Sequence, residues 1–245
     1  MPVRESEAII LRTYPLGEGD RLVSFLSRAE GRVRGVARGA RKPKSRFGAS
    51  LEPLSHVRIW FYERETRQLV RISQCELIES FLEAQRSYNA NVAFGLIAEI
   101  SEAVLPEREP SDPAFRLLLA TCRAIQSRGS IALPIGYFTL WTVRLGGWLP
   151  SLDHCAACGR DLAGQPGWAN TEGSGVFCRQ CRPPGSRPFS AEALATARTM
   201  LRGSLEKLAA AGTRVPDELT NYWMDLIEQH IERKLTVRSM LELAP

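Results

Sequence analysis

Hydrophobic and polar residues alternate along the first 80 residues, and alternation of this kind is typical of strands with one buried face. Five segments rich in β-branched and aromatic residues, each bounded by glycine, proline, aspartate or charged residues, lie at 7–14, 20–28, 31–38, 54–63 and 68–78. In the fourth segment, one set of alternate side chains is apolar and the other is basic or aromatic. The apolar set is Val57, Ile59 and Phe61, and the other set is His56, Arg58, Trp60 and Tyr62. We therefore predict five short strands, of which the fourth carries a basic, aromatic outer face.

The number and spacing of these strands favour a small β-barrel. Five strands within 80 residues, with a long connection between the third and the fourth, is the element count of an OB-type barrel. SH3-like barrels share this count, so the strand pattern alone leaves both folds open.

Beyond residue 80, the apolar residues recur at helical spacing. The predicted helices cover 82–105, 112–128, 131–145, 190–211 and 217–243. The second helix begins with Asp112 as a candidate N-cap and Pro113 at the first helical position, and both features favour a helix start. We therefore expect an α+β multidomain protein, with a five-stranded barrel over residues 1–80 and a helical domain over residues 81–245.

Charge is distributed unevenly between these two parts. Residues 1–80 hold 15 Lys and Arg against 10 Asp and Glu, whereas residues 81–245 hold 17 of each, so the formal net charge of +5 resides in the predicted barrel. Residues 31–48 (GRVRGVARGARKPKSRFG) alone hold seven basic side chains, four glycines and no acid. Like charges at this density are tolerated mainly where a polyanion neutralises them, which indicates nucleic acid ahead of a membrane surface. A solvated loop without a ligand is the alternative.

Exposed aromatic rings beside cations are suited to single-stranded nucleic acid, because bases stack on the rings while Lys and Arg follow the phosphates. The candidate DNA-binding residues are Arg32, Arg34, Arg38, Arg41, Lys42, Lys44, Arg46, Arg58, Trp60 and Tyr62. As an alternative, Trp60 and Tyr62 pack beneath a neighbouring loop or domain.

Four cysteines form two C-x2-C pairs in CAACGRDLAGQPGWANTEGSGVFCRQC. These are Cys155 with Cys158 and, after nineteen intervening residues, Cys178 with Cys181. Each turn presents two thiolates to one ion, so the spacing predicts one zinc ion in a module over residues 150–186, inserted in the helical domain. Four sulfur ligands leave no position for a reacting water, which makes the ion structural. Two disulfides would need an oxidising compartment, and a redox C-x-x-C would not need a duplicate.

The sequence contains no recognisable secretory signal or membrane span. Its first residues, MPVRESEAIILRTY, lack the apolar region of a signal peptide, and no run approaches the roughly 18 apolar residues that a membrane span needs. We therefore expect a cytoplasmic protein with reduced thiols and no membrane partner.

Three stretches of the chain resemble the RecO family of bacterial recombination mediators and DNA repair proteins. The first is LGEGDRLVSFLSRAEGRVRGVARGARKPKSRFGASLEP. Its shared features are Gly17, Glu18 and Asp20 before the second strand, Gly31 at the following turn, Gly39, Ala40, Arg41 and Lys42, then Ser45, Leu51 and Pro53. The second stretch, FTLWTVRLGGWLPSLDHCAACG, is similar to the segment that leads into the family's zinc module. The third, HIERKLTVRSMLEL, is similar to the family's C-terminal helix.

This resemblance covers nearly the whole chain in order, and it implies an OB-type domain, a helical body and a zinc module. It also implies a recombination mediator that binds single- and double-stranded DNA, anneals complementary strands and helps load RecA on strands coated by single-strand-binding protein. The implied partners are RecR and the C-terminal tail of the single-strand-binding protein, and the implied location is the cytoplasm, in association with the nucleoid. Some family members lack the four cysteines, so zinc is expected here because the ligands are present in this chain.

Catalytic motifs are absent from the sequence. It contains no P-loop, no H-E-x-x-H and no G-x-S-x-G motif, and its three histidines lie in separate predicted elements. We therefore expect a protein that is not an enzyme. One alternative is a metal-dependent nuclease or transferase with a basic groove, which cleavage of DNA in the presence of Mg²⁺ would favour. Another is a transcription or translation factor with a zinc ribbon, which sequence- or structure-specific binding would reveal.

Overall fold

The computed structural model describes residues 3–63, 68–127, 130–170 and 175–242. Contacts within the chain divide it into two compact units. The first unit comprises Met1–Arg128 together with Leu235–Pro245, and the second unit comprises Gly129–Lys234. Among the helices so described, none has the length and apolar character needed to cross a membrane.

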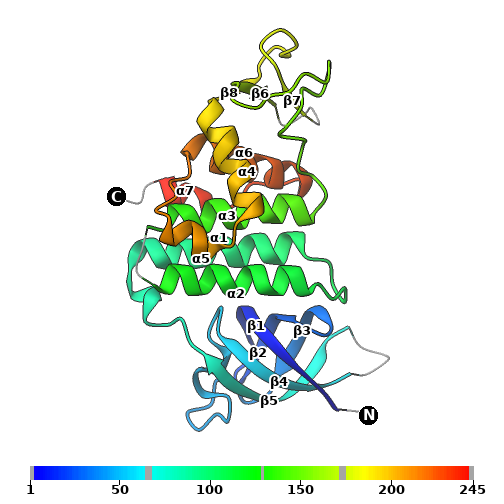
Figure 1. The fold of residues 1–245 in the computed structure, drawn as a ribbon. Helices are drawn as coiled ribbons and strands as arrows, with labels where there is room; N and C mark the ends of the chain where they lie inside the picture. Colours follow the sequence, from blue (N-terminus) through cyan, green and yellow to red (C-terminus); the bar gives the residue numbers. More distant parts are fainter. Residues whose placement is uncertain (1–2, 64–67, 128–129, 171–174, 243–245) are drawn as a thin grey trace. The chain divides into compact units, whose positions relative to one another are not determined.

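The first unit begins with five strands that form a closed barrel (Figure 1). The strands are β1 (Val3–Leu16), β2 (Asp20–Ser27), β3 (Gly31–Ala37), β4 (His56–Tyr62) and β5 (Val70–Glu79). Their order is β1-β2-β3-β5-β4, and β1 closes the barrel by pairing with β4. Neighbouring strands are antiparallel except β3 and β5, which run parallel. The prediction of five N-terminal strands followed by helices is confirmed, and the barrel is consistent with the OB type.

Alternate residues of each strand fill the barrel interior, as the sequence pattern predicts. Ile59 and Phe61 of β4 are fully buried, and Phe25 of β2 meets Phe61 edge to face with ring centroids 5.7 Å apart. His56 departs from the predicted outer face and is only 5% exposed. Its ring packs edge to face on Phe115, with centroids 5.8 Å apart, and this contact removes it from solvent.

Helices and short 3-10 turns complete the first unit. They are α1 (Tyr88–Val104), α2 (Asp112–Gln126), α7 (Arg238–Glu242), η1 (Gly48–Leu51) and η2 (Ala84–Arg86). The predicted N-cap of α2 is wrong by one residue. The Ser111 side chain accepts a hydrogen bond from the Ala114 N–H at 3.3 Å, and Asp112 is the first helical residue.

Glu99 of α1 holds the C-terminal segment of the first unit. Its side chain is buried and accepts hydrogen bonds from the backbone N–H groups of Thr236 and Val237, both at 3.0 Å. These two N–H groups lie within the stretch 217–243, which the sequence predicts as one helix. That prediction is wrong, because this part of the chain forms two helices separated by a turn that Glu99 caps.

The second unit consists of helices and a small three-stranded sheet (Figure 1). Its elements are α3 (Ala132–Leu145), β6 (Gly167–Ala169), β7 (Val176–Phe177), β8 (Arg187–Phe189), α4 (Ala191–Arg202), α5 (Leu205–Ala210) and α6 (Asp217–His230). The strand order of the sheet is β7-β6-β8. The helix predicted over 190–211 is interrupted at Gly203, because the Ser204 side chain caps a new helix by accepting from the Lys207 N–H at 3.4 Å.

Candidate nucleic-acid interface and metal centre

A loop of basic residues leaves the barrel after β3. We call residues 38–46 the basic loop, and its exposed cations are Arg38, Arg41, Lys42, Lys44 and Arg46. The Gly39 N–H donates to Oδ1 of Asp20 at 2.8 Å, and the Arg41 N–H donates to the Gly19 carbonyl at 3.0 Å. At the other end of the loop, Phe47 is buried in the barrel core. The barrel therefore anchors both ends of the loop and leaves its charged side chains in solvent.

The cations of the basic loop keep their charge available. Within the part of the chain that the structure describes, no carboxylate forms an ion pair with any of the five. The Arg41 guanidinium donates to the Gly17 carbonyl at 3.0 Å, and the Arg46 guanidinium lies 5.0 Å from the centroid of the Phe47 ring. Neither contact neutralises the charge, so the loop is suited to a polyanion.

The two predicted cations of β3 are already paired. Arg32 donates from Nε to the Leu105 carbonyl at 2.7 Å, and its side chain is only 17% exposed. Oε1 of Glu107 lies 3.3 Å from Nη1 of Arg32 and 2.8 Å from Nε of Arg34. A backbone hydrogen bond from the Arg108 N–H to the Arg32 carbonyl, at 3.0 Å, holds this segment against β3. The seven predicted cations thus divide into five in the basic loop and two that share an acid.

The candidate residues on β4 face an acid of β1. Glu5 accepts a hydrogen bond from Nε1 of Trp60 at 3.0 Å, and its other carboxylate oxygen lies 3.6 Å from Nε of Arg58. Trp60 and Tyr62 are both half-buried, so each ring has only part of its surface in solvent. Since β5 separates β4 from β3, the structure does not bring Arg58 and Trp60 beside the cations of β3.

Sequence reasoning missed Arg71, which is exposed on β5. It pairs with Val36 of β3 on one side and with Tyr62 of β4 on the other, and it has no acidic partner among the residues described. Directly paired residues share a face of a sheet, so Arg71 and Tyr62 lie on the same outer surface of the barrel. The alternation in β5 reveals this position, because Val70 and Ile72 on either side are buried.

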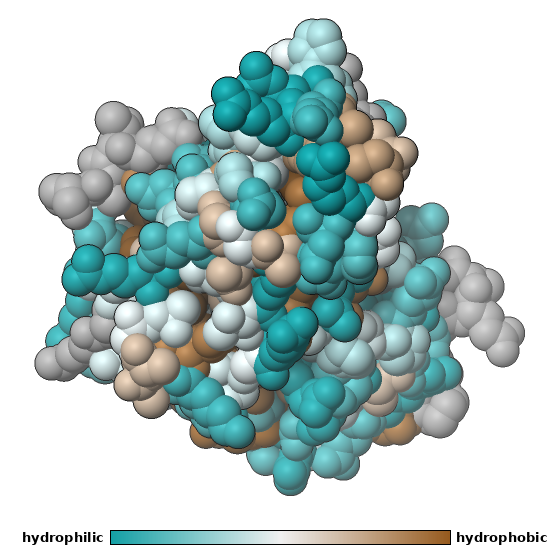
Figure 2. Space-filling view, turned by 45° about the horizontal axis from the view of Figure 1, so that its top comes forward, coloured by the Kyte–Doolittle hydropathy of each residue, from teal (hydrophilic) through white to brown (hydrophobic). Residues whose placement is uncertain are grey.

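Hydrophilic residues predominate on the face of the molecule shown in Figure 2. Apolar residues are visible on that face in small areas between charged and polar ones.

The four predicted zinc ligands lie together in the second unit. The Sγ atoms of Cys155, Cys158, Cys178 and Cys181 are all within 4.8 Å of one another, and those of Cys158 and Cys178 are 3.9 Å apart. Tetrahedral Zn–S bonds of about 2.3 Å would separate the sulfurs by about 3.8 Å, so this spacing fits one ion. No other group of three or more histidine, cysteine or acidic side chains within the described ranges is arranged to hold a metal.

Backbone N–H groups favour the thiolate forms of two of these cysteines. Burial alone would raise the pKa of Cys155, but the N–H groups of Cys178, Cys158 and Ala157 outweigh it and lower this pKa to about 6. Burial also opposes ionisation of Cys178, whose pKa is lowered by N–H groups of the turn that follows it. The pKa of Cys181 is raised to about 12, because its thiol is hydrogen-bonded to the sulfurs of Cys178 and Cys158. A bound cation would displace that remaining proton.

Glycines allow the two cysteine turns to form close together. Gly159 adopts a left-handed φ of 71°, and its N–H donates to the Cys155 carbonyl at 2.9 Å. A Cβ atom added to Gly175 would lie 2.2 Å from Cβ of Ala156, so only glycine fits beside the first turn. The chain is thus shaped locally to present four sulfurs to one point.

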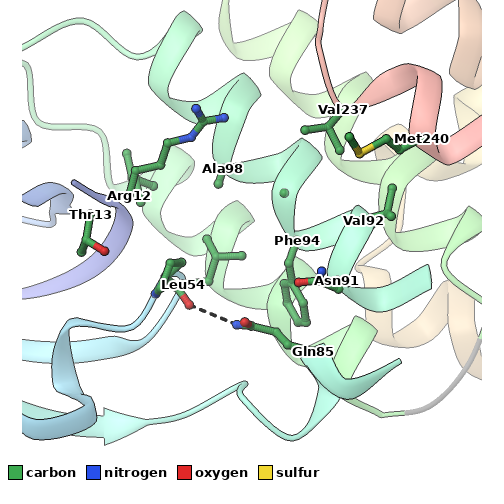
Figure 3. A pocket seen from close by; sticks show the side chains of 13 residues that line it. Arg12, Thr13, Leu54, Gln85, Asn91, Val92, Phe94, Ala98, Val237 and Met240 are labelled. Atoms are coloured by element: carbon green, nitrogen blue, oxygen red, sulfur yellow. Dashed lines mark hydrogen bonds between the residues drawn. The ribbon is translucent and has the colours of Figure 1, made fainter. Parts of the chain in front are cut away.

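A pocket of about 370 Å³ lies in the first unit, lined by residues of β1, α1 and the C-terminal segment (Figure 3). Phe94 and Met240 contribute to its apolar wall, and Arg12, which pairs with Glu102 at 3.2 Å, also lines it. The described residues that line this pocket include no histidine, cysteine or acid. Its polar side chains are those of Arg12, Thr13, Gln85 and Asn91, so it offers a partly polar place for binding.

Comparison with known proteins identifies the family. The family model described as "Recombination protein O N terminal" matches residues 1–81, and the one described as "Recombination protein O C terminal" matches residues 85–239. A protein of Koribacter versatilis (strain Ellin345) named DNA repair protein RecO is 39% identical over 243 residues, which cover 98% of each chain. Proteins of the same name from Nocardioides sp. and Frankia casuarinae are 35% and 34% identical, over 96% and 100% of this chain and 98% and 100% of theirs. The chain therefore belongs to the RecO family of DNA repair proteins.

Proposed function

We propose that this protein is a non-enzymatic recombination mediator that binds single- and double-stranded DNA through the outer surface of its barrel. The observation that carries this proposal is the basic loop, whose five exposed cations are anchored to the barrel and pair with no described carboxylate. Charge of this kind grips phosphates without regard to sequence.

Annealing of complementary strands follows from the same charge. Two strands repel each other through their phosphates, and a protein that neutralises part of this charge lowers the barrier to their approach. Arg71 and Tyr62 on the neighbouring strands provide a cation and a partly exposed ring for a strand that leaves the loop. No covalent bond forms or breaks in this process, so no nucleotide is consumed.

We further propose that the protein acts with RecR and with the C-terminal tail of the single-strand-binding protein. Together these contacts would help load RecA on strands coated by that protein, in the cytoplasm and in association with the nucleoid. Membership of the RecO family along almost the whole chain supports these partners. Anisotropy titration of fluorescently labelled RecR, and of a labelled peptide with the sequence of the tail, with this protein tests both contacts, and the absence of binding by either would remove that partner.

The second unit would hold one structural Zn²⁺ through Cys155, Cys158, Cys178 and Cys181. Bound there, the ion would cross-link the two cysteine turns, and its four thiolate ligands would leave no open position for a substrate or an activated water. The support for this assignment is the spacing of the four sulfurs and the N–H groups that favour ionisation of Cys155 and Cys178.

An annealing assay with two complementary labelled oligonucleotides tests the proposal. The protein should accelerate annealing equally with and without ATP, and the acceleration should decrease as salt increases. The triple substitution Arg38→Glu, Lys42→Glu and Lys44→Glu should reduce the rate at least about tenfold, because it replaces three phosphate contacts with repulsion.

The matched control changes three exposed cations of the second unit, Arg202→Glu, Lys207→Glu and Arg214→Glu. This control alters the net charge by the same amount and should retain most of the activity. A requirement for ATP, or wild-type annealing by the loop variant, would contradict the proposal. Cleavage of the DNA in Mg²⁺ would show instead that the protein is an enzyme.

A further inference from the structure

The small sheet of the second unit has one buried face and one partly exposed face. In β6, Gly167 and Ala169 are buried, whereas Trp168 between them is partly exposed. Trp168 is paired with Phe177 of β7 and with Pro188 of β8. Because directly paired residues share a face, these three side chains form one outer row across the sheet.

The inner face of this sheet packs against α4. Val176 and Phe189 on that face are buried. A Cβ atom added to Gly167 would lie 2.5 Å from Val176 and 2.9 Å from Leu194 of α4, which shows how closely the two elements approach. The core of this region is therefore formed by the inner face, and the aromatic rings of the outer row lie on the side that α4 does not cover.

Two arginines follow β7 in the chain, and one of them contacts the outer row. The Arg182 guanidinium lies 5.6 Å from the centroid of the Trp168 ring. Arg179 is exposed in the turn between Cys178 and Cys181. A guanidinium supported on an indole is held in place to stack on a base or to contact a phosphate.

Among the described residues, these two arginines lack the acidic partners that neighbouring arginines have. Arg187 pairs with Asp225, and Arg198 pairs with Asp153 at 2.9 Å. Within the described ranges, no carboxylate forms an ion pair with Arg179 or Arg182. The outer face thus combines partly exposed rings with positive charge that the described carboxylates leave unpaired.

This combination selects among possible partners. The bases of a duplex are already stacked on one another and do not need rings, whereas single-stranded nucleic acid offers free base faces for rings and phosphates for arginines. We propose that the outer face of the small sheet, with Phe177, Trp168, Arg179 and Arg182, is a second contact for single-stranded nucleic acid. The proposal deepens the proposed function, on which it rests, by adding a contact in the second unit to the basic loop of the first.

Photo-cross-linking of the unmodified protein gives a direct test. The probe is a single-stranded oligonucleotide of about 30 nucleotides with 5-iodouracil at several positions, and the cross-linked residues are mapped by mass spectrometry. We expect cross-links at Trp168 or Phe177, which an unlabelled single strand competes away and an unlabelled duplex competes less well. Cross-links confined to the barrel would overturn the proposal.

A substitution at the same surface provides a second measurement. Changing Arg179 and Arg182 to Glu should weaken binding of the single strand about tenfold and reduce the slope of log K against log salt by about 1.4, for two lost phosphate contacts. The matched control is the double substitution Arg202→Glu and Lys207→Glu, outside the small sheet, which should weaken binding only slightly, through net charge, and leave the slope nearly unchanged. Zinc content measured on each variant shows whether its cysteine turns are intact. The cross-linking test uses the unmodified protein, so its result does not depend on whether the variants fold.

The basic-loop variant separates this inference from the proposed function. One outcome is that the loop variant loses binding while the Arg179/Arg182 variant binds as tightly as the wild type, with the same slope of log K against log salt. That result would reject the second contact and support the barrel site. If the loop variant retains binding and the Arg179/Arg182 variant loses it, the second contact stands and the barrel site is wrong.

Discussion

Nε of Arg34 lies 2.8 Å from Oε1 of Glu107, an acid 73 positions further along the chain, and the same oxygen lies 3.3 Å from Nη1 of Arg32. Two of the seven cations that the sequence assigns to DNA therefore share one carboxylate within the folded protein, which offsets one of their two charges. The pair of Arg34 with Glu107 is half exposed, so it contributes little to stability, and phosphate groups can compete for it. The acid thus sets how many cations the barrel presents to a strand.

Replacing Glu107 with Gln should increase the affinity for single-stranded DNA and make it more sensitive to salt. If only the five cations of the basic loop contact phosphates, log K should decrease with log salt at a slope of about −3.5, or about a hundredfold between 50 and 200 mM. Release of Arg34 should steepen the slope toward about −4, because Arg32 is mostly buried and keeps its hydrogen bond to the Leu105 carbonyl. Fluorescence anisotropy with a labelled oligo-dT across a salt series measures both values.

The control for this prediction is Glu109→Gln, which removes the same charge two residues away. Glu109 is exposed, and its side chain forms no ion pair with the cations of β3. It should raise the affinity slightly through net charge and leave the slope nearly unchanged. Equal slopes for both variants would mean that Glu107 does not hold Arg34 away from DNA.

Gly31 should be intolerant of substitution, whereas Gly17 should accept it at moderate cost. Both adopt a left-handed φ, of 72° and 59°, so alanine at either position costs about 1 kcal/mol. A Cβ on Gly31 would also lie 2.2 Å from the carbonyl oxygen of Glu109, whereas one on Gly17 would meet nothing within 4 Å. Gly31→Ala should therefore lose about 3 kcal/mol of unfolding free energy, measured by urea denaturation, against about 1 for Gly17→Ala. Similar losses would show that the contact with Glu109 relaxes freely.

The strands could be predicted from the sequence because each one buries alternate residues, and that period is local. Helix ends were harder to predict. Residues on both sides of Gly203 favour helix, and the interruption depends on the Ser204 cap. The turn before α7 depends on Glu99, whose hydrogen-bond partner Val237 is 138 residues away, and no local pattern indicates such a contact.

The candidate sites also differ in whether neighbouring residues in the sequence are enough to predict them. The four cysteines stand in two short turns, so their spacing alone predicts the cluster that the structure forms. The availability of a cation depends instead on the acids that folding brings near it. Arg34 and Lys42 look alike in the sequence, yet Arg34 meets Glu107 and Lys42 meets no described carboxylate.

Loss of one cysteine should remove the metal and loosen the second unit. Protein purified without chelators should contain about one zinc per chain by elemental analysis, and Cys158→Ser should contain almost none, because three ligands hold the ion much less tightly. Hydrogen exchange should increase in residues 150–186 and remain unchanged in the barrel.

The matched control is Cys122→Ser, which changes a buried cysteine outside the cluster and should keep the zinc. A metal-free protein with full protection of residues 150–186 would contradict the assignment.

Burial of His56 should make the protein less stable as the pH decreases below neutral. Burial lowers the pKa of this imidazole from its ordinary value, against the opposing influence of Glu7 and Glu79, while Arg123 adds to the decrease. In the unfolded chain the ring takes up a proton as the pH falls through about 6.5, whereas the folded protein resists protonation until a lower pH. The unfolded state therefore binds more protons in this window, and the free energy of unfolding should decrease from about pH 7 downward until the folded ring also titrates.

The substitution His56→Gln should flatten this part of the pH profile, measured by urea denaturation between pH 7.5 and 5. This holds even if the variant is less stable than the wild type at pH 7.5, because the test compares the slopes of the two profiles. A variant profile as steep as that of the wild type would assign the pH dependence to other groups.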